Sequence, residues 1–254
     1  MPILSVTSLL ATAMDALRSA HRNRVIRYSL LALIIVDAFL LLTFVAYAIV
    51  EFFDITSSYL YGRTVFSTAD WSLIECSCYF KEAICVGMLG VMARRTRSIL
   101  FGALTFFVAA VLADDSLRFH EVIGRHVAAA GVYKPLAELV ASMIYGVIPA
   151  IVLLLAWLRE GEARRRDSLP IVAALALLLF FAVIVDVIRQ LTHKIITDGE
   201  KIAALIEDGG ELLSLTLLVV IVAGTCSRIM ASSRTLGDGL PSAATAATPP
   251  FGMG

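Results

Sequence analysis

Long apolar stretches alternate with short polar segments along most of this chain. Six of the stretches reach or approach the ~20 residues that a helix needs to cross the hydrocarbon core of a membrane. They span residues 27–50, 70–93, 98–121, 134–158, 169–192 and 201–229. We therefore predict an all-α fold, a polytopic bundle of six transmembrane helices that occupies residues 26–231.

The two ends of the chain differ from this central domain. Over residues 1–25, a helix would place Leu10, Met14 and Leu17 on one face, and several arginines follow. This pattern favours an amphipathic helix in the membrane interface over a cleavable signal peptide. Residues 232–254 consist largely of Ser, Ala, Thr, Pro and Gly. Because this segment has little apolar surface to bury, we expect a disordered C-terminal tail.

Composition supports a membrane protein. The chain is 59% hydrophobic with a mean hydropathy of +0.87, which is too apolar for a soluble domain of this length. Its zero net charge says little about partners, because the charges are segregated by side. We expect membrane lipids and a small polar or lipid-linked molecule as partners, and no nucleic acid; the oligomeric state stays open. The four cysteines fall in the second and sixth spans, so no disulfide framework is indicated.

The basic residues predict the orientation in the membrane. Of the 21 lysines and arginines, thirteen lie before the first span, in the 2–3 and 4–5 loops, or after the last span. An excess of Lys and Arg near the ends of spans marks the cytoplasmic side. We therefore expect both termini in the cytoplasm.

Ionisable residues within the apolar spans carry the functional signal, because each is costly in a bilayer and requires a partner, a cavity or a function. With the predicted orientation, most of them gather near the non-cytoplasmic end. Only Asp37, Lys81 and Glu82 lie deeper. The full set near that end is Glu75, Asp114, Asp115, Arg118, His120, Glu121, Glu138, Asp186, Arg189, His193, Glu207, Asp208 and Glu211.

The third span has two interpretations. As one continuous helix it places Asp114, Arg118, Glu121 and Arg125 on one face, where they can form a salt-bridge ladder. Asp115 then faces another helix. The side chain of His120 points away from both aspartates unless the helix breaks, and Gly124 lies just beyond it.

The other spans leave a similar choice between pairing and ligand binding. The three acids of the sixth span, Glu207, Asp208 and Glu211, cannot all ionise without cations from another helix, a bound cation or protonation. Arg118, Arg189 and Lys81 are candidate partners. In the second span, we expect Lys81 to pair with a glutamate of its own helix. In the fifth, Asp186 and Arg189 are spaced as a local pair.

Oxygen-rich side chains in this pattern suit a divalent cation such as Mg²⁺, Ca²⁺ or Mn²⁺, and mixed oxygen and nitrogen ligands suit Fe or Zn. The candidate metal ligands are Asp115, Glu207, Asp208 and Glu211. The candidate acid–base residues are His120, His193 and Glu121. The candidate ligand-binding residues are Arg118, Arg189, Glu75, Lys81, Asp114 and Asp186.

Three acidic motifs resemble those of a group of uncharacterised six-span bacterial inner-membrane proteins. The motifs are Glu75 through Tyr79 to Lys81, Asp114-Asp115-x4-His120-Glu121, and Glu207-Asp208-x-x-Glu211. The resemblance covers most of residues 70–225. It implies a six-helix protein of the bacterial inner membrane and no established activity. The chain is also similar to alkaline-ceramidase-like membrane hydrolases in its membrane-embedded Asp and His. Those enzymes use several histidines on zinc, whereas the last span here contains no histidine, which argues against such a site.

Three functions stay open. The first is an outward-facing, carboxylate-rich site for a divalent cation or a polar or lipid head group, in a membrane hydrolase or transferase. The sequence contains no recognisable nucleophile motif, so whether the protein is an enzyme is undecided. The second is a proton- or cation-coupled transporter, which requires a polar route inward through Asp37, Lys81 and Glu82. The third is a receptor or assembly subunit whose charge network fixes helix packing.

Overall fold

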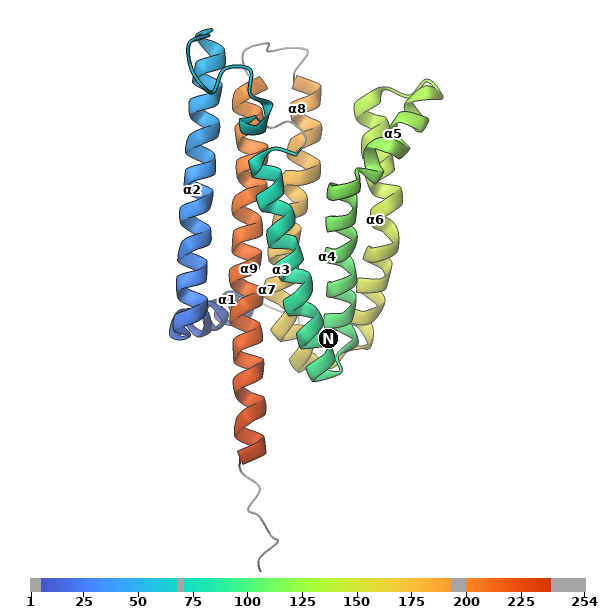
Figure 1. The fold of residues 1–254 in the computed structure, drawn as a ribbon. Helices are drawn as coiled ribbons and strands as arrows, with labels where there is room; N and C mark the ends of the chain where they lie inside the picture. Colours follow the sequence, from blue (N-terminus) through green and yellow to red (C-terminus); the bar gives the residue numbers. More distant parts are fainter. Residues whose placement is uncertain (1–5, 68–70, 193–199, 239–254) are drawn as a thin grey trace, which may run out of the picture.

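The computed structural model describes residues 6–67, 71–192 and 200–238, and within them the chain is all-helical (Figure 1). The elements are α1 (Val6–Arg22), α2 (Arg24–Phe52), the short 3-10 helix η1 (Thr64–Phe66), α3 (Leu73–Thr96), α4 (Ile99–Leu117), α5 (Phe119–Ala129), α6 (Lys134–Arg159), α7 (Glu162–Leu179), the π-helix η2 (Phe180–Val185), α8 (Asp186–Thr192) and α9 (Glu200–Asp238).

Six helical segments are long and apolar enough to cross a membrane, which confirms the expected fold class. They correspond to α2, α3, α4, α6, the continuous run of α7, η2 and α8, and α9. The chain is thus a multi-pass membrane protein. The last helix continues to Asp238, past the expected boundary at residue 231, and residues 239–254 lie outside the described part.

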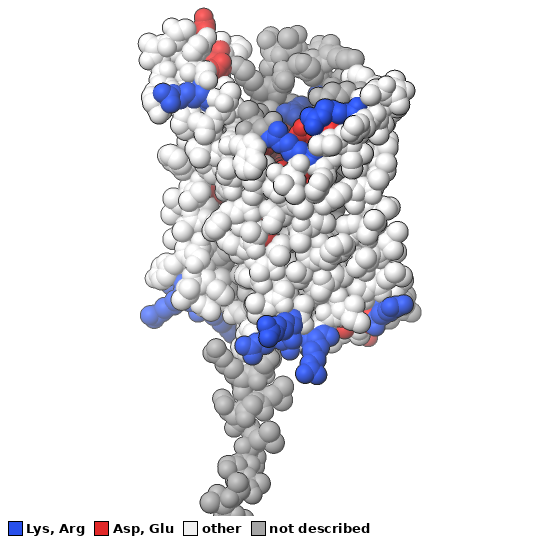
Figure 2. Space-filling view, turned by 45° about the vertical axis from the view of Figure 1, so that its right-hand side comes forward, with Lys and Arg blue, Asp and Glu red and all other residues white. Residues whose placement is uncertain are grey.

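Helix α9 forms the centre of the bundle. It contacts α1, α2, α3, α7 and α8, and Leu212, Leu215, Leu218 and Val222 on it are almost completely buried. Helices α3, α4 and α6 pack in succession, and α5 packs against α6 (Figure 1). We call the end of the bundle at which α1 lies the α1 end, and the opposite end the α5 end. Figure 2 shows charged side chains at both ends and an uncharged belt between them.

Helix α1 forms where the sequence predicts an amphipathic helix, but its buried face consists of small residues. Ala16 and Ala20 are buried against neighbouring helices, and α1 packs on α9 and α7. A Cβ at Gly224 of α9 would lie only 2.0 Å from the carbonyl oxygen of Ala16. Leu10 and Met14 remain exposed. The small face therefore docks on the protein and leaves the larger apolar side chains free for lipid.

The third span differs from the prediction because the helix breaks. Arg118 adopts a left-handed conformation with φ of 56°, ends α4 and begins α5. The predicted continuous face through Asp114, Arg118, Glu121 and Arg125 is therefore wrong. Residues 119–129 form a separate helix that packs against α6 at the α5 end.

A buried ion pair connects α2 to the rest of the bundle. Nζ of Lys81 lies 2.6 Å from Oδ1 of Asp37 and 3.2 Å from the carbonyl oxygen of Leu212. The hydroxyl of Thr216 donates to the other oxygen of Asp37. The expectation that Lys81 pairs with a glutamate of its own helix is wrong, because its side chain turns toward α2 and α9.

Candidate ligand pocket

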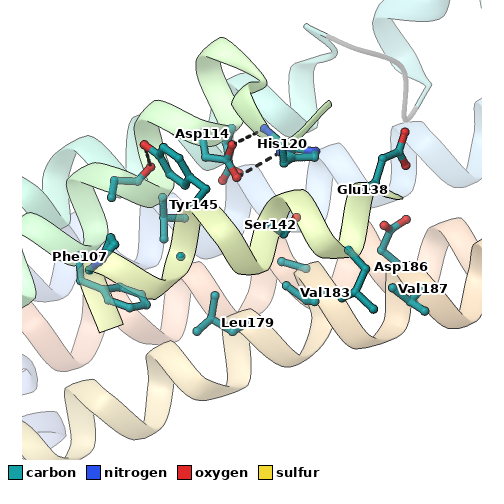
Figure 3. Close-up of a pocket in the computed structure, with 17 residues that line it drawn as sticks. Phe107, Asp114, His120, Glu138, Ser142, Tyr145, Leu179, Val183, Asp186 and Val187 are labelled. Carbon is teal, nitrogen blue, oxygen red and sulfur yellow. Dashed lines mark hydrogen bonds and ion pairs between the residues drawn. The ribbon is translucent and has the colours of Figure 1, made fainter. Parts of the chain in front are cut away.

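A cavity of about 130 Å³ lies between α4, α6 and the run of η2 and α8, near the α5 end (Figure 3). Its lining comes from residues far apart in the sequence, from Phe107 to Val187. The break at Arg118 contributes to the site, because it allows the start of α5 to turn over the end of α4.

The lining of the cavity combines apolar and ionisable side chains. Phe107 lies toward one end of the view and Glu138 and Asp186 toward the other, with Val183 and Val187 beside them (Figure 3). The ionisable lining residues are Asp114, Asp115, His120, Glu138 and Asp186. Among the described residues, the lining therefore has four carboxyl groups and one histidine, and no lysine or arginine. A lining that is richer in carboxyls than in basic groups favours a positively charged occupant.

Asp114 and His120 meet because of the helix break. Oδ1 of Asp114 accepts a hydrogen bond from the backbone N–H of His120 at 2.8 Å, and Oδ2 lies 3.1 Å from Nδ1 of its ring. The first contact satisfies a backbone donor in the opening turn of α5. The second raises the pKa of His120 above its ordinary value, against the opposing effect of burial. The prediction that His120 points away from the aspartates assumed an unbroken helix. Because the helix breaks at Arg118, His120 instead contacts Asp114.

One face of α6 supplies the opposite wall. Glu138, Ser142 and Tyr145 line the pocket at a spacing of four and three residues, which places them on the same side of a helix. The hydroxyl of Tyr145 donates to the carbonyl oxygen of Ala110 at 3.1 Å. A Cβ at Gly124 would lie 2.8 Å from Cγ of Glu138, so glycine permits the close approach of α5 to α6. The reasoning from sequence missed Ser142 and Tyr145, although their periodicity with Glu138 was a usable signal.

The predicted pair on the fifth span is confirmed and extended. Arg189 lies 3.1 Å from Oδ1 of Asp186 and 2.6 Å from Oε2 of Glu207. Arg189, one of the three candidate partners for the acids of α9, therefore pairs with Glu207. Arg189 and Arg118 do not line this pocket.

Helix α3 places a second acidic group beside the pocket. The hydroxyl of Tyr79 lies 3.0 Å from Oε2 of Glu75 and 3.1 Å from the carbonyl oxygen of Asp115. Glu75 also accepts a hydrogen bond from the backbone N–H of Trp71 at 2.7 Å. Glu82 lies deeper on the same helix, is only 1% exposed, and has its carboxyl within hydrogen-bond reach of Asp115.

The candidate metal and acid–base residues that the structure describes lie on several different helices. Among the described residues, no group of three or more His, Cys, Asp or Glu side chains is arranged to hold a metal ion. Asp115 turns toward Glu82, and Glu207 toward Arg189. Asp208 and Glu211 are half-buried on α9, and Glu121 is half-buried on α5 outside this pocket. His193 lies outside the described residues.

Residues 26–225 match the profile of a family described as a domain of unknown function (DUF8692). The chain belongs to this family. The matched region extends from α2 into α9 and contains every residue that lines the pocket. No curated protein and no solved structure matches the chain. Membership of DUF8692 thus accompanies a six-span membrane architecture, and the function has to be argued from the pocket.

Proposed function

We propose that this protein binds an amphipathic molecule from the membrane, with a positively charged head group in the acidic part of the pocket. The observation that carries the proposal is a single cavity whose lining combines apolar side chains with four carboxyls and a histidine. Specific sites for small molecules commonly combine an apolar lining with a few convergent polar groups.

The volume limits which part of the ligand lies inside. A cavity of about 130 Å³ is close to the size of the engineered 150 Å³ cavity that holds benzene, whereas drug-sized ligands need about 300–1,000 Å³. The cavity therefore has room for a small head group and a few methylenes. The rest of an apolar chain would lie in the bilayer.

The neighbouring surfaces suit such a chain. Val147 of α6, Ile184 of η2 and Ile188 of α8 are about half exposed, and they lie within membrane-spanning segments next to lining residues. A ligand held by its head group would pack its chain against these side chains. Lipid access at this side is consistent with the expected membrane-lipid partners.

The charge of the site selects the head group. Asp186 already pairs with Arg189, and Asp114 with His120. Asp115 and Glu138 add two further carboxyl groups to the same cavity. A primary ammonium group can donate three hydrogen bonds to these oxygens, so we favour an amine-bearing amphiphile over an anionic lipid.

A set of matched amphiphiles tests this proposal. In nanodiscs, dodecylammonium should raise the unfolding temperature of the protein, and dodecanol and dodecanoate of the same chain length should not. At a free concentration one hundredfold above Kd, the expected stabilisation is about 2.7 kcal/mol. Native mass spectrometry of the purified protein checks whether an amphiphile is already bound.

Two tryptophan variants separate specific binding from partitioning into the bilayer. Ser142→Trp places an indole in the pocket and should abolish the response to dodecylammonium. Met143→Trp is the matched control, because Met143 is 66% exposed on the same helix and does not line the pocket. Equal responses to all three amphiphiles, or an unchanged response in Ser142→Trp, would refute the proposal. Stabilisation by Mg²⁺, Ca²⁺ or Mn²⁺ alone, reversed by a chelator, would refute it in favour of a metal site.

A further inference from the structure

The buried side of the pocket contains a pair of carboxyl groups from two helices. The carboxyl of Glu82 on α3 is within hydrogen-bond reach of the carboxyl of Asp115 on α4. Oε2 of Glu82 is buried and has no N–H or hydroxyl partner among the described residues. Ionised carboxylates only accept hydrogen bonds, so two of them cannot share one unless one carries a proton. A hydrogen bond between these two carboxyls therefore needs a proton on one of them.

Acidic groups outnumber basic groups around the pair. The nearby lysine, Lys81, is engaged with Asp37 of α2 and the carbonyl oxygen of Leu212. The other ionisable groups around the pair are Glu75, Cys78, Tyr79 and Cys85 on α3, Asp114 on α4, Arg118 between α4 and α5, His120 on α5, and Glu211 on α9, with Asp208 and Asp186 beyond Glu211. Most of these groups are acids, and neighbouring acids disfavour further negative charge.

Asp115 belongs to both the carboxyl pair and the pocket. It lines the cavity together with Asp114 and His120, whereas Glu82 does not line it and is only 1% exposed. A positive head group in the pocket would therefore act directly on one member of the pair. An adjacent cation favours the ionised form of a carboxyl.

We propose that the Glu82–Asp115 pair exchanges its proton for the positive charge of the bound head group. When the ammonium group arrives, the O–H bond of the protonated carboxyl breaks, its electron pair stays on the carboxylate oxygen, and the proton passes to water at the α5 end. One positive charge replaces another, so the net charge of the buried site does not change. This inference rests on the proposed function and adds to it that binding is coupled to the release of one proton.

Whether the Glu82–Asp115 pair holds a proton can be measured without a ligand. Infrared spectroscopy of the protein in nanodiscs at neutral pH should show the C=O stretch of a protonated carboxyl, with the expected shift in heavy water. Glu82→Gln and Asp115→Asn should each remove the part of this band that comes from the pair. Glu162→Gln is the control, because Glu162 is an exposed acid in the first turn of α7 at the other end of the bundle. A band whose intensity neither Glu82→Gln nor Asp115→Asn lowers relative to the wild type would overturn the inference.

The coupling is tested with dodecylammonium. Titration calorimetry in two buffers of different ionisation enthalpy should show release of about one proton per bound amphiphile. Release of one proton makes the affinity rise about tenfold per pH unit while the pair is protonated. In Glu82→Gln the amide can donate to an ionised Asp115, so binding should persist, release no proton and lose most of its pH dependence.

The outcomes distinguish the two proposals. Binding by the wild type without proton release overturns the coupling and leaves the proposed function standing. If no dodecylammonium binds, the proposed function fails and the coupling fails with it, whereas the infrared band still reports whether the pair holds a proton. If Glu82→Gln does not fold, Asp115→Asn provides the infrared comparison, and the buffer comparison on the wild type alone decides the coupling.

Discussion

The polar contacts of the Lys81 side chain reach two other helices. Its ammonium group is 0% exposed, lies 2.6 Å from Asp37 of α2, and donates to the carbonyl oxygen of Leu212 on α9. Asp37 in turn accepts a hydrogen bond from Thr216. Buried ion pairs often stabilise a fold little compared with an apolar replacement, but removal of one partner leaves a buried charge without compensation.

Replacement of Lys81 alone should therefore destabilise the protein more than replacement of the pair. We expect Lys81→Met to lower the free energy of unfolding by about 3–5 kcal/mol, and Lys81→Met combined with Asp37→Leu to recover most of that loss. Unfolding in a denaturing detergent, followed by circular dichroism, measures both. Arg95→Met serves as the control, because Arg95 is exposed near the end of the same helix. A double variant as unstable as Lys81→Met would contradict the predicted role.

The sequence predicts local pairs better than pairs between helices. The spacing of Asp186 and Arg189 indicates their contact, because residues three apart adjoin on any helix. The partner of Lys81 could not be predicted in this way. Asp37 lies 44 residues earlier, and only the packing of α2 against α3 and α9 brings it close. The same limit explains why a proton-sharing pair of Glu82 and Asp115 was not foreseen.

At the scale of helices, apolar length predicted all six spans but none of the irregular turns between or within them. The break at Arg118 uses a left-handed conformation that glycine and asparagine adopt far more readily than arginine, so the sequence gives no local sign of it. Gly124, which was the suspected break, instead allows α5 to approach Glu138 of α6. The π-helix η2 likewise lies within an apolar run without a distinctive residue pattern.

The contact between α1 and α9 depends on the absence of a side chain at Gly224. We expect Gly224→Ala to displace α1, because its Cβ would lie 2.0 Å from the backbone carbonyl oxygen of Ala16, and to cost about 1–3 kcal/mol by overpacking. Trypsin should then cleave the purified protein faster after Arg18 and Arg22. Both arginines are exposed on α1.

Gly102→Ala provides the matched control for this substitution. Gly102 lies in helix α4, and a Cβ there would have no atom within 4 Å. Alanine at such a helical position should be neutral or stabilise the protein by about 0.5–1 kcal/mol, and the rate of cleavage in α1 should not change. Equal cleavage rates in the two variants would show that α1 does not need the close contact at Gly224.

At the scale of the whole molecule, the two ends of the bundle carry different chemistry. The α1 end has the arginines of α1, of the α3–α4 connection and of the start of α7, and the acidic pocket lies toward the α5 end. Both α1 and the C-terminal end of α9 lie at the α1 end (Figure 1). The distribution of Lys and Arg favours the cytoplasm for that side, which would open the pocket toward the other face of the membrane.

Single cysteines in an otherwise cysteine-free chain test this orientation in intact bacterial cells. Tyr59 is 69% exposed in the segment between α2 and α3 at the α5 end, and Arg95 is exposed at the α1 end. A membrane-impermeant maleimide should label Tyr59→Cys in intact cells, but Arg95→Cys only after permeabilisation. The opposite pattern would reverse the orientation. The head group would then enter the pocket from the cytoplasmic leaflet, and the proton released on binding would pass to the cytoplasm rather than away from it.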